Sequence, residues 1–334
     1  SAFDAVDCKQ IKLPGRDVPS NHSFQFVEGE YMKAEEYDAF LDDHTDFTIR
    51  TFLPRVYGTF KSFEAVPPIK ALLFAYSGLS LSSVFANLGI VSAIESFWKA
   101  GLLAKKHNEK AREFNKEMEG LGLPLLISGV ASAPFDLFSD QLRGMKGVML
   151  DMYRQPDKLL AAIDKITPML IELAVVGSKI SGKPGVFIPL HRGADGFMSL
   201  EQFETFYWKS LKKLILALID EDLIPCPFFE GNFTTRLEYL TELPKGKILG
   251  FFDNTDIYKA KEILSDTMCM SGLMPLSLLQ TGTPETVKAY TKELIDVVGK
   301  DEGFIMGPKS AMDEAKPELV KVWFEFTKEY GVYG

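Results

Sequence analysis

Hydrophobic and polar positions in residues 224–256 follow a strand, helix, strand order. Residues 224–229 form a short apolar and aromatic run, which is typical of a strand buried in a parallel sheet. Apolar residues then recur at helical spacing through residues 234–243, until Pro244 and Gly246 end the helix. A second apolar run starts at residue 248 and leads to Asp253. Each of the two runs is followed by a carboxylate, Glu230 and Asp253.

The same pattern extends over residues 123–334. Strands are expected at residues 124–130, 186–190, 224–229, 247–252, 267–270 and 303–306. Helices are expected around residues 140–153, 156–180, 199–220, 284–298 and 317–330, with Ser199 and Gln202 as a capping box and Thr283 as an N-cap. This alternation predicts an α/β fold, a (β/α)8 TIM barrel, in which the strands at 186–190, 224–229 and 247–252 are parallel neighbours. A doubly wound open sheet is the alternative, but no Gly-rich phosphate fingerprint follows a strand.

The amino-terminal half adds a helical excursion to this barrel. Residues 23–31 are strand-like, residues 34–43 predict a helix, and residues 67–122 are mostly helical. The last of these stretches divides into an apolar part, 70–103, and a charged amphipathic helix, 105–119. No repeat, low-complexity tract or linker divides the chain, so a single domain over residues 1–334 is expected.

Composition narrows the class of protein. A net charge of −9 argues against nucleic acid as a partner. Three scattered cysteines without metal-ligand spacing indicate a reducing compartment, so a cytoplasmic protein is expected. Residues 71–93 carry no charge, but their serines and glycines favour burial in a core over a membrane span.

Several stretches of residues 123–334 resemble the uroporphyrinogen decarboxylase (URO-D) superfamily. They read SGVASAPFDLFSDQLRG, YRQPDKLLAAIDKI, SLEQFETFYWKSLKKLI, FFEGN, MSGLMPLSLLQTGTPETVK and GFIMGPKSAMDEAKPE, with QFVEGEYMKAEEYDAF near the start. Within the superfamily the chain is most similar to the corrinoid-dependent methyltransferases of anaerobes, in particular those that demethylate aromatic methyl ethers. The resemblance implies the barrel fold, a small-molecule methyl donor and a separate corrinoid protein as partner. Assembly into a homodimer stays open.

Two departures from the family pattern bear on the chemistry. The decarboxylase holds substrate carboxylates with an arginine-rich loop near its amino terminus, whereas Arg16, Arg50 and Arg55 stand apart here, although such a loop can lie outside this chain. Thiol-directed methyltransferases of the family bind zinc through His-x-Cys and a later cysteine. In this chain the first becomes Phe228-Phe229-Glu230, and residues 307–310 contain no cysteine.

The nitrogen and oxygen donors that remain are His191, Glu230 and Asp253. Catalytic groups of a barrel lie at the carboxyl ends of its strands, and neighbouring strands are about 4.8 Å apart. The three side chains are therefore expected to reach one site, where a His, Glu and Asp set suits zinc with an open position. Residues two apart on a strand share a face, so Phe228 is expected to face the same mouth as Glu230.

Each candidate also has a plainer interpretation. Glu230 can form a salt bridge with Arg192 or Arg236, and those arginines can instead meet a substrate carboxylate. Asp253 can cap the next helix, and His191 can hydrogen-bond a loop. Cys226 and Cys269 lie inside predicted strands and are expected to be buried small hydrophobes.

The leading functional hypothesis is methyl transfer from a small, aromatic methyl ether to the Co(I) of a separate corrinoid protein. The leaving phenolate needs help, either from zinc on His191 and Glu230 or from Glu230 as a general acid. Two alternatives stay open: a decarboxylase of a tetrapyrrole or related acid, and a non-catalytic barrel whose mouth binds a ligand or partner.

Overall fold

The computed structural model describes residues 1–73, 82–300 and 302–332. Contacts between these residues divide the chain into two compact units. Unit 1 comprises Ser1–Val18, Phe24–Leu125 and Leu137–Lys165, and unit 2 comprises Pro19–Ser23, Leu126–Asp136 and Ile166–Gly334. The single domain over residues 1–334 stays a prediction.

Unit 1 is the helical excursion that the sequence predicts. Its short α-helices are α1 (Ala2–Ala5), α2 (Tyr37–Asp42), α3 (His44–Phe47), α4 (Leu53–Val56) and α8 (Gly144–Arg154). Its tighter or wider helical turns are η1 (Ala34–Glu36), η2 (Thr48–Phe52), η3 (Gly58–Ala65), η4 (Ile69–Leu73), η5 (Ser83–Ala86) and η6 (Leu137–Leu142). The two-residue strands β1 (Ile11–Lys12) and β2 (Gln25–Phe26) pair antiparallel.

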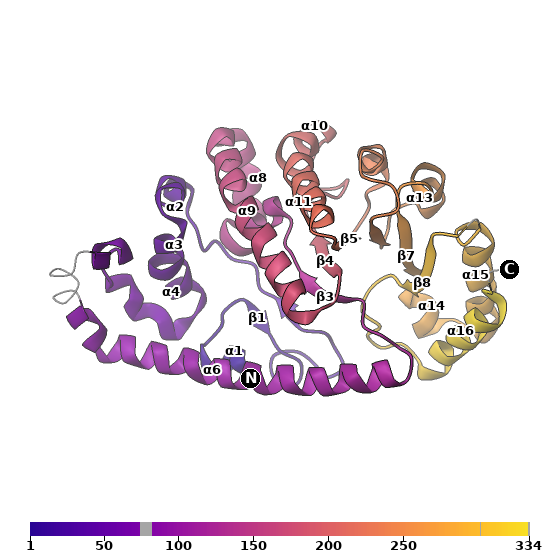
Figure 1. The fold of residues 1–334 in the computed structure, drawn as a ribbon, viewed down its shortest axis with the longest axis horizontal. Helices are drawn as coiled ribbons and strands as arrows, with labels where there is room; N and C mark the ends of the chain where they lie inside the picture. The colour runs from indigo at the N-terminus through magenta and orange to yellow at the C-terminus, as the bar shows by residue number, and fades with distance from the viewer. Residues whose placement is uncertain (74–81, 301, 333–334) are drawn as a thin grey trace. The chain divides into compact units, whose positions relative to one another are not determined.

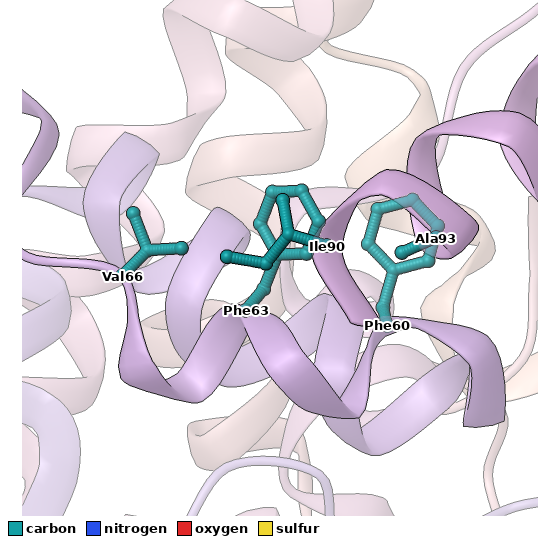
Figure 2. Close-up of a cluster of buried hydrophobic side chains, with 5 residues drawn as sticks. All are labelled: Phe60, Phe63, Val66, Ile90 and Ala93. Carbon is teal, nitrogen blue, oxygen red and sulfur yellow. The ribbon is translucent and has the colours of Figure 1, made fainter. Parts of the chain in front are cut away.

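One long helix, α6 (Leu88–Gly120), replaces the separate apolar and charged segments that we expected over residues 70–119. It begins after Asn87, whose side chain accepts a hydrogen bond from the backbone N–H of Gly89. Where α6 meets η3, five side chains form the buried cluster in Figure 2: Phe60, Phe63, Val66, Ile90 and Ala93. Residues 74–81 of the uncharged run lie outside the described part of the chain. Within that part, no helix combines the length and apolarity that crossing a membrane requires.

A buried ion pair anchors α8 within unit 1. Arg143, 3% exposed, donates from Nε to the Asp151 carboxylate at 2.6 Å. The Tyr37 hydroxyl donates to the same carboxylate at 2.9 Å. Asp151 is 1% exposed, so its charge is compensated inside the protein by these two partners.

Unit 2 contains a parallel sheet whose strands follow chain order from β3 to β8 (Figure 1). The strands are β3 (Ile127–Val130), β4 (Gly185–Leu190), β5 (Ile224–Phe229), β6 (Leu249–Phe252), β7 (Cys269–Met274) and β8 (Phe304–Pro308). The α/β class, the barrel-type parallel sheet and the parallel pairing of β4, β5 and β6 are therefore confirmed. The described residues contribute six strands to this sheet, and closure into an eight-stranded barrel stays a prediction.

Helices follow the strands of unit 2, as a barrel-type sheet requires. They are α7 (Pro134–Asp136), α10 (Leu200–Gln202), η7 (Phe203–Trp208), α11 (Lys209–Asp220), η8 (Thr234–Arg236), α12 (Leu237–Leu240), α13 (Ile257–Leu264), α14 (Leu276–Thr281), α15 (Pro284–Val297) and α16 (Pro317–Tyr330). Helix α9 (Pro156–Ser181) contains the boundary between the units. The capping box of Ser199 with Gln202 and the N-cap Thr283 are confirmed.

Two prolines decide how strand β5 pairs. The backbone N–H of Ile224 donates to the Pro184 carbonyl on the β4 side. Because successive N–H groups of a strand point to opposite sides, the positions of Pro225 and Pro227 face β6, where proline has no N–H to donate. Pairing with β6 accordingly begins only at Phe228, beyond both prolines. The unpaired starts of the two strands border a cavity of about 380 Å³.

Consecutive phenylalanines on β5 serve opposite faces of the sheet. Phe229 is 1% exposed and stacks on Phe252 with ring centroids 4.8 Å apart. Phe228 faces the other side, is only half-buried, and stacks on Phe187. Phe229 therefore belongs to the core and Phe228 to an accessible surface.

We expect Phe229→Ala to lower the free energy of unfolding by about 3–5 kcal/mol, because it leaves a cavity under the sheet. Phe228→Ala, one residue away on the half-buried face, is the matched control and should cost clearly less. Urea denaturation of both variants, followed by circular dichroism, measures the difference. Equal losses would contradict the assignment of the two faces.

Candidate functional site

His191 and Glu230 come together at the carboxyl edge of the sheet. Strands β4 and β5 pair Leu190 with Phe229, so the residues that follow lie side by side. His191 Nε2 lies 3.3 Å from Glu230 Oε2. The side chains are 34% and 53% exposed, which leaves both accessible to a ligand. The predicted juxtaposition of these two residues is thus present.

Asp253 follows β6 at the same edge, and its catalytic role stays a prediction. Its Oδ2 accepts the backbone N–H of Gly231 at 3.2 Å and the Asn254 side-chain N–H at 2.8 Å. It therefore holds the turn that carries Glu230. Helix α13 is capped by Asp256, whose carboxylate accepts from Tyr258 and Lys259, so Asp253 is not the cap.

The fit of zinc to this edge can be tested on the donors themselves. Catalytic zinc is held by three protein ligands. Across residues 1–73, 82–300 and 302–332, no three His, Cys, Asp or Glu side chains are grouped so that they could hold a metal ion. His191 and Glu230 make a pair, and Asp253 does not complete it. This donor set does not fit the predicted zinc, and the chemistry below takes no step through a metal.

An aromatic surface lies on the face of the sheet opposite Phe229. Phe187, Phe228 and Phe251 come from three neighbouring strands and are each half-buried. The Phe187 ring stacks on Phe228 at 6.0 Å and meets Phe251 edge-on at 6.3 Å. Glu230 follows Phe228 by two residues, past the end of β5, where its backbone N–H donates to the Phe228 carbonyl at 3.0 Å. We call Phe187, Phe228 and Phe251 the aromatic floor.

The two predicted arginines differ in their surroundings. Arg192 follows His191 and its guanidinium lies over the Phe197 ring at 5.2 Å, a cation–π contact at the same edge. Arg236 is 3% exposed, and its Nη1 lies 2.9 Å from Asp195 Oδ1. It also donates to the Gly193 carbonyl at 3.2 Å. These contacts make Arg236 a clamp on the loop after β4, and its contact with a substrate stays a prediction.

Sequence reasoning missed Asp136, which the structure places against the turn of His191. It is 2% exposed and lies just beyond β3. A signal was available, because Asp136 is the one charged residue in the run ASAPFDLF, residues 131–138. A charge in such a run is costly to bury without partners. Tyr207, from η7, is the second missed residue and meets Asp136.

The two cysteines of the sheet differ in burial: Cys226 is buried, whereas Cys269 is half-buried and borders the cavity at the starts of β5 and β6. Burial raises the pKa of Cys226 to about 12 and also raises the pKa of Cys269. Since the thiolate is the nucleophile and the metal ligand, both residues are poor candidates for either role. This environment agrees with their interpretation as small hydrophobes.

Comparison with known proteins identifies relatives. The family model described as uroporphyrinogen decarboxylase (URO-D) matches residues 111–330. Among solved structures, a methyltransferase from Methanosarcina mazei aligns with a TM-score of 0.60 at 15% sequence identity, covering 99% of this chain and 78% of that chain. At this identity the likeness shows the fold alone. No curated protein matches the chain in sequence.

We expect Cys226→Ser and Cys269→Ser to leave most of the activity intact. In the native protein, Cys226 should resist alkylation at pH 9, because only about one thiol in a thousand is ionised there when the pKa is about 12. Iodoacetamide labelling followed by mass spectrometry, with urea-unfolded protein as control, measures this. Rapid labelling of native Cys226, or loss of activity in the serine variant, would contradict a purely structural role.

Proposed function

The chain belongs to the uroporphyrinogen decarboxylase family, and on that premise we propose that it is a methyltransferase. Its substrate is a small aromatic methyl ether, and the methyl group goes to the Co(I) of a corrinoid carried by a separate protein. The methyltransferase named among the structural neighbours supports the reaction type through the shared fold. The substrate class rests on the edge of the sheet described above.

The observation that carries the proposal is the position of the His191–Glu230 pair at the ends of β4 and β5, the strands that carry Phe187 and Phe228 of the aromatic floor. An aromatic ring resting on Phe228 would place a substituent oxygen towards the strand end, where the pair lies. Stacked and edge-to-face contacts favour aromatic rings over aliphatic chains of similar size. A polar pair beside an apolar surface is what a methyl aryl ether, with one oxygen and one ring, requires.

The reaction requires these residues to donate a proton to the leaving oxygen. As the methyl carbon moves to the Co(I) acceptor, the carbon–oxygen bond breaks and negative charge develops on the phenolic oxygen. A proton held between His191 Nε2 and Glu230 Oε2, which are 3.3 Å apart, can pass to that oxygen and release the product as a phenol. The pair thereby acts as the general acid of the reaction, and the proton is restored from solvent.

The corrinoid is assigned to a partner because the sequence offers no segment to bind it, such as a histidine followed by a Gly-rich loop. The four histidines are His22, His44, His107 and His191. His191 is followed by Arg192, Gly193, Ala194 and Asp195, which the structure uses to build the clamped loop. The partner therefore supplies the acceptor as a second substrate.

The decarboxylase alternative depends on arginines that are free to bind carboxylates. In unit 1, Arg50 Nη2 lies 2.6 Å from Asp46, and Arg55 Nη2 lies 2.6 Å from Glu36. Arg16 pairs with Asp17 at 2.6 Å. Each of the three is already matched with a carboxylate of the chain, which favours the methyltransferase.

Methyl transfer to a Co(I) corrinoid protein, followed by its visible spectrum, tests the function. We expect turnover with at least one methoxyaromatic compound of a panel and none with methanol or dimethyl ether, since these lack a ring for the aromatic floor. Uroporphyrinogen decarboxylation is assayed in parallel. Decarboxylation without methyl transfer, or equal turnover of aliphatic donors, would overturn the proposal.

We expect Glu230→Gln to reduce kcat by about 100-fold, because an amide keeps the size of the side chain but cannot hold the shared proton. The pH profile of kcat should lose one limb, and metal content should not change. Glu238→Gln, at an exposed position of α12, is the control and should match the parent protein.

Two results of that experiment would contradict the assignment. Full activity of Glu230→Gln with the true substrate would return Glu230 to a salt bridge with His191. A parallel fall in metal content and activity, measured by elemental analysis, would instead support zinc on His191 and Glu230, because an amide is a weaker ligand than a carboxylate.

A further inference from the structure

Asp136 is a buried carboxylate that the reaction does not use directly. It is 2% exposed, and its two oxygens face the turn that follows β4. Oδ2 accepts the backbone N–H of His191 at 2.8 Å, and Oδ1 accepts the backbone N–H of Arg192 at 3.1 Å. One carboxylate therefore receives the N–H groups of two successive residues, which fixes the orientation of the peptide plane between them.

Tyr207 supports the same turn from a different element. Its hydroxyl donates to Asp136 Oδ2 at 2.7 Å. Its ring, 1% exposed, lies directly under Gly193, where an added Cβ would meet a ring carbon at 2.7 Å. Only glycine fits at this approach. The turn is thus seated on the Tyr207 ring and held by the Asp136 carboxylate.

On the far side of the turn, the loop after β5 completes the enclosure. Arg236 reaches the Gly193 carbonyl and the Asp195 carboxylate, and the Thr235 hydroxyl donates to Asp195 at 3.0 Å. Contacts from α7, η7 and η8 therefore converge on residues 191–195. Contacts from several elements on one turn are expected where a side chain must hold one orientation.

We infer that Asp136 is a positioning residue, which orients His191 towards Glu230 and so sets the geometry of the proton donor. This inference rests on the proposed function of the His191–Glu230 pair. The imidazole of His191 is attached to a turn whose two successive backbone N–H groups, those of His191 and Arg192, both donate to the Asp136 carboxylate. A turn released from one bond can rotate, and a displacement of about 1 Å in a catalytic group is enough to lower a rate by about 100-fold.

The role calls for a carboxylate. The two oxygens of Asp136 accept from the backbone N–H groups of His191 and Arg192 and from the Tyr207 hydroxyl. An asparagine offers a single acceptor oxygen, and its NH2 group would face a donor of the turn or the Tyr207 hydroxyl. Asp136→Asn therefore removes the restraint on the turn while the size of the side chain stays the same.

Asp136→Asn is expected to lower kcat by about tenfold to a hundredfold, with little change in KM for the methyl donor, because the aromatic floor is intact. In a His191→Gln background the same substitution should have almost no further effect, since Asp136 acts through His191. Tyr207→Phe, which removes the hydrogen bond from the tyrosine hydroxyl to Asp136 and keeps the ring, should fall between the parent protein and Asp136→Asn. Further loss on adding Asp136→Asn to His191→Gln would overturn the inference and leave the proposed function in place.

A readout independent of activity completes the test. The imidazole signal of His191, one of only four histidines, is identified by its absence from the NMR spectrum of His191→Gln. It should shift or broaden in Asp136→Asn. Asp151→Asn is the matched control, because Asp151 is equally buried and also accepts from a tyrosine hydroxyl. It should lower Tm without changing the His191 signal. An unchanged His191 signal in folded Asp136→Asn would refute the positioning role, whatever the substrate proves to be.

Discussion

The parallel register between β4 and β5 is the constraint on which the site depends. Because Leu190 pairs with Phe229, the chain must place His191 beside Glu230 at the strand ends. A shift of one residue would turn Glu230 to the other face and separate the pair. The prolines of β5 do not disturb this register, since their missing N–H groups face β6 and the ladder to β4 is complete.

Carboxylates from neighbouring strand ends then hold the two turns that carry the pair. Asp136, after β3, accepts the backbone N–H groups of the His191 turn, and Asp253, after β6, accepts the N–H of Gly231. The two side chains proposed to act on a ligand thus lie between side chains that fix the backbone. The division explains why the acidic residues of this edge are not interchangeable, although all three follow a strand.

Much of the fold could be predicted because it depends on local patterns. The apolar run of β5 and the capping residues Ser199 and Thr283 fix their elements with little tertiary help. The long helix α6 was predicted as two segments, because the sequence changes from apolar to charged residues along it. Such a change does not break a helix. The proximity of His191 and Glu230 could be predicted from strand order. The contacts of Asp253 and Arg236 could not, because they depend on loop conformations. Asp136 was missed because its partners are backbone N–H groups and Tyr207, which no spacing along the chain reveals.

The central claim is that the pair and the aromatic floor form one ligand site. A crystal structure of the protein with a bound methoxyaromatic compound tests it most directly. The account predicts the ring against Phe228 and the ether oxygen within about 3.2 Å of Glu230 or His191, the reach of a hydrogen bond. Binding elsewhere, such as in the cavity at the starts of β5 and β6, with nothing at the pair, would contradict it.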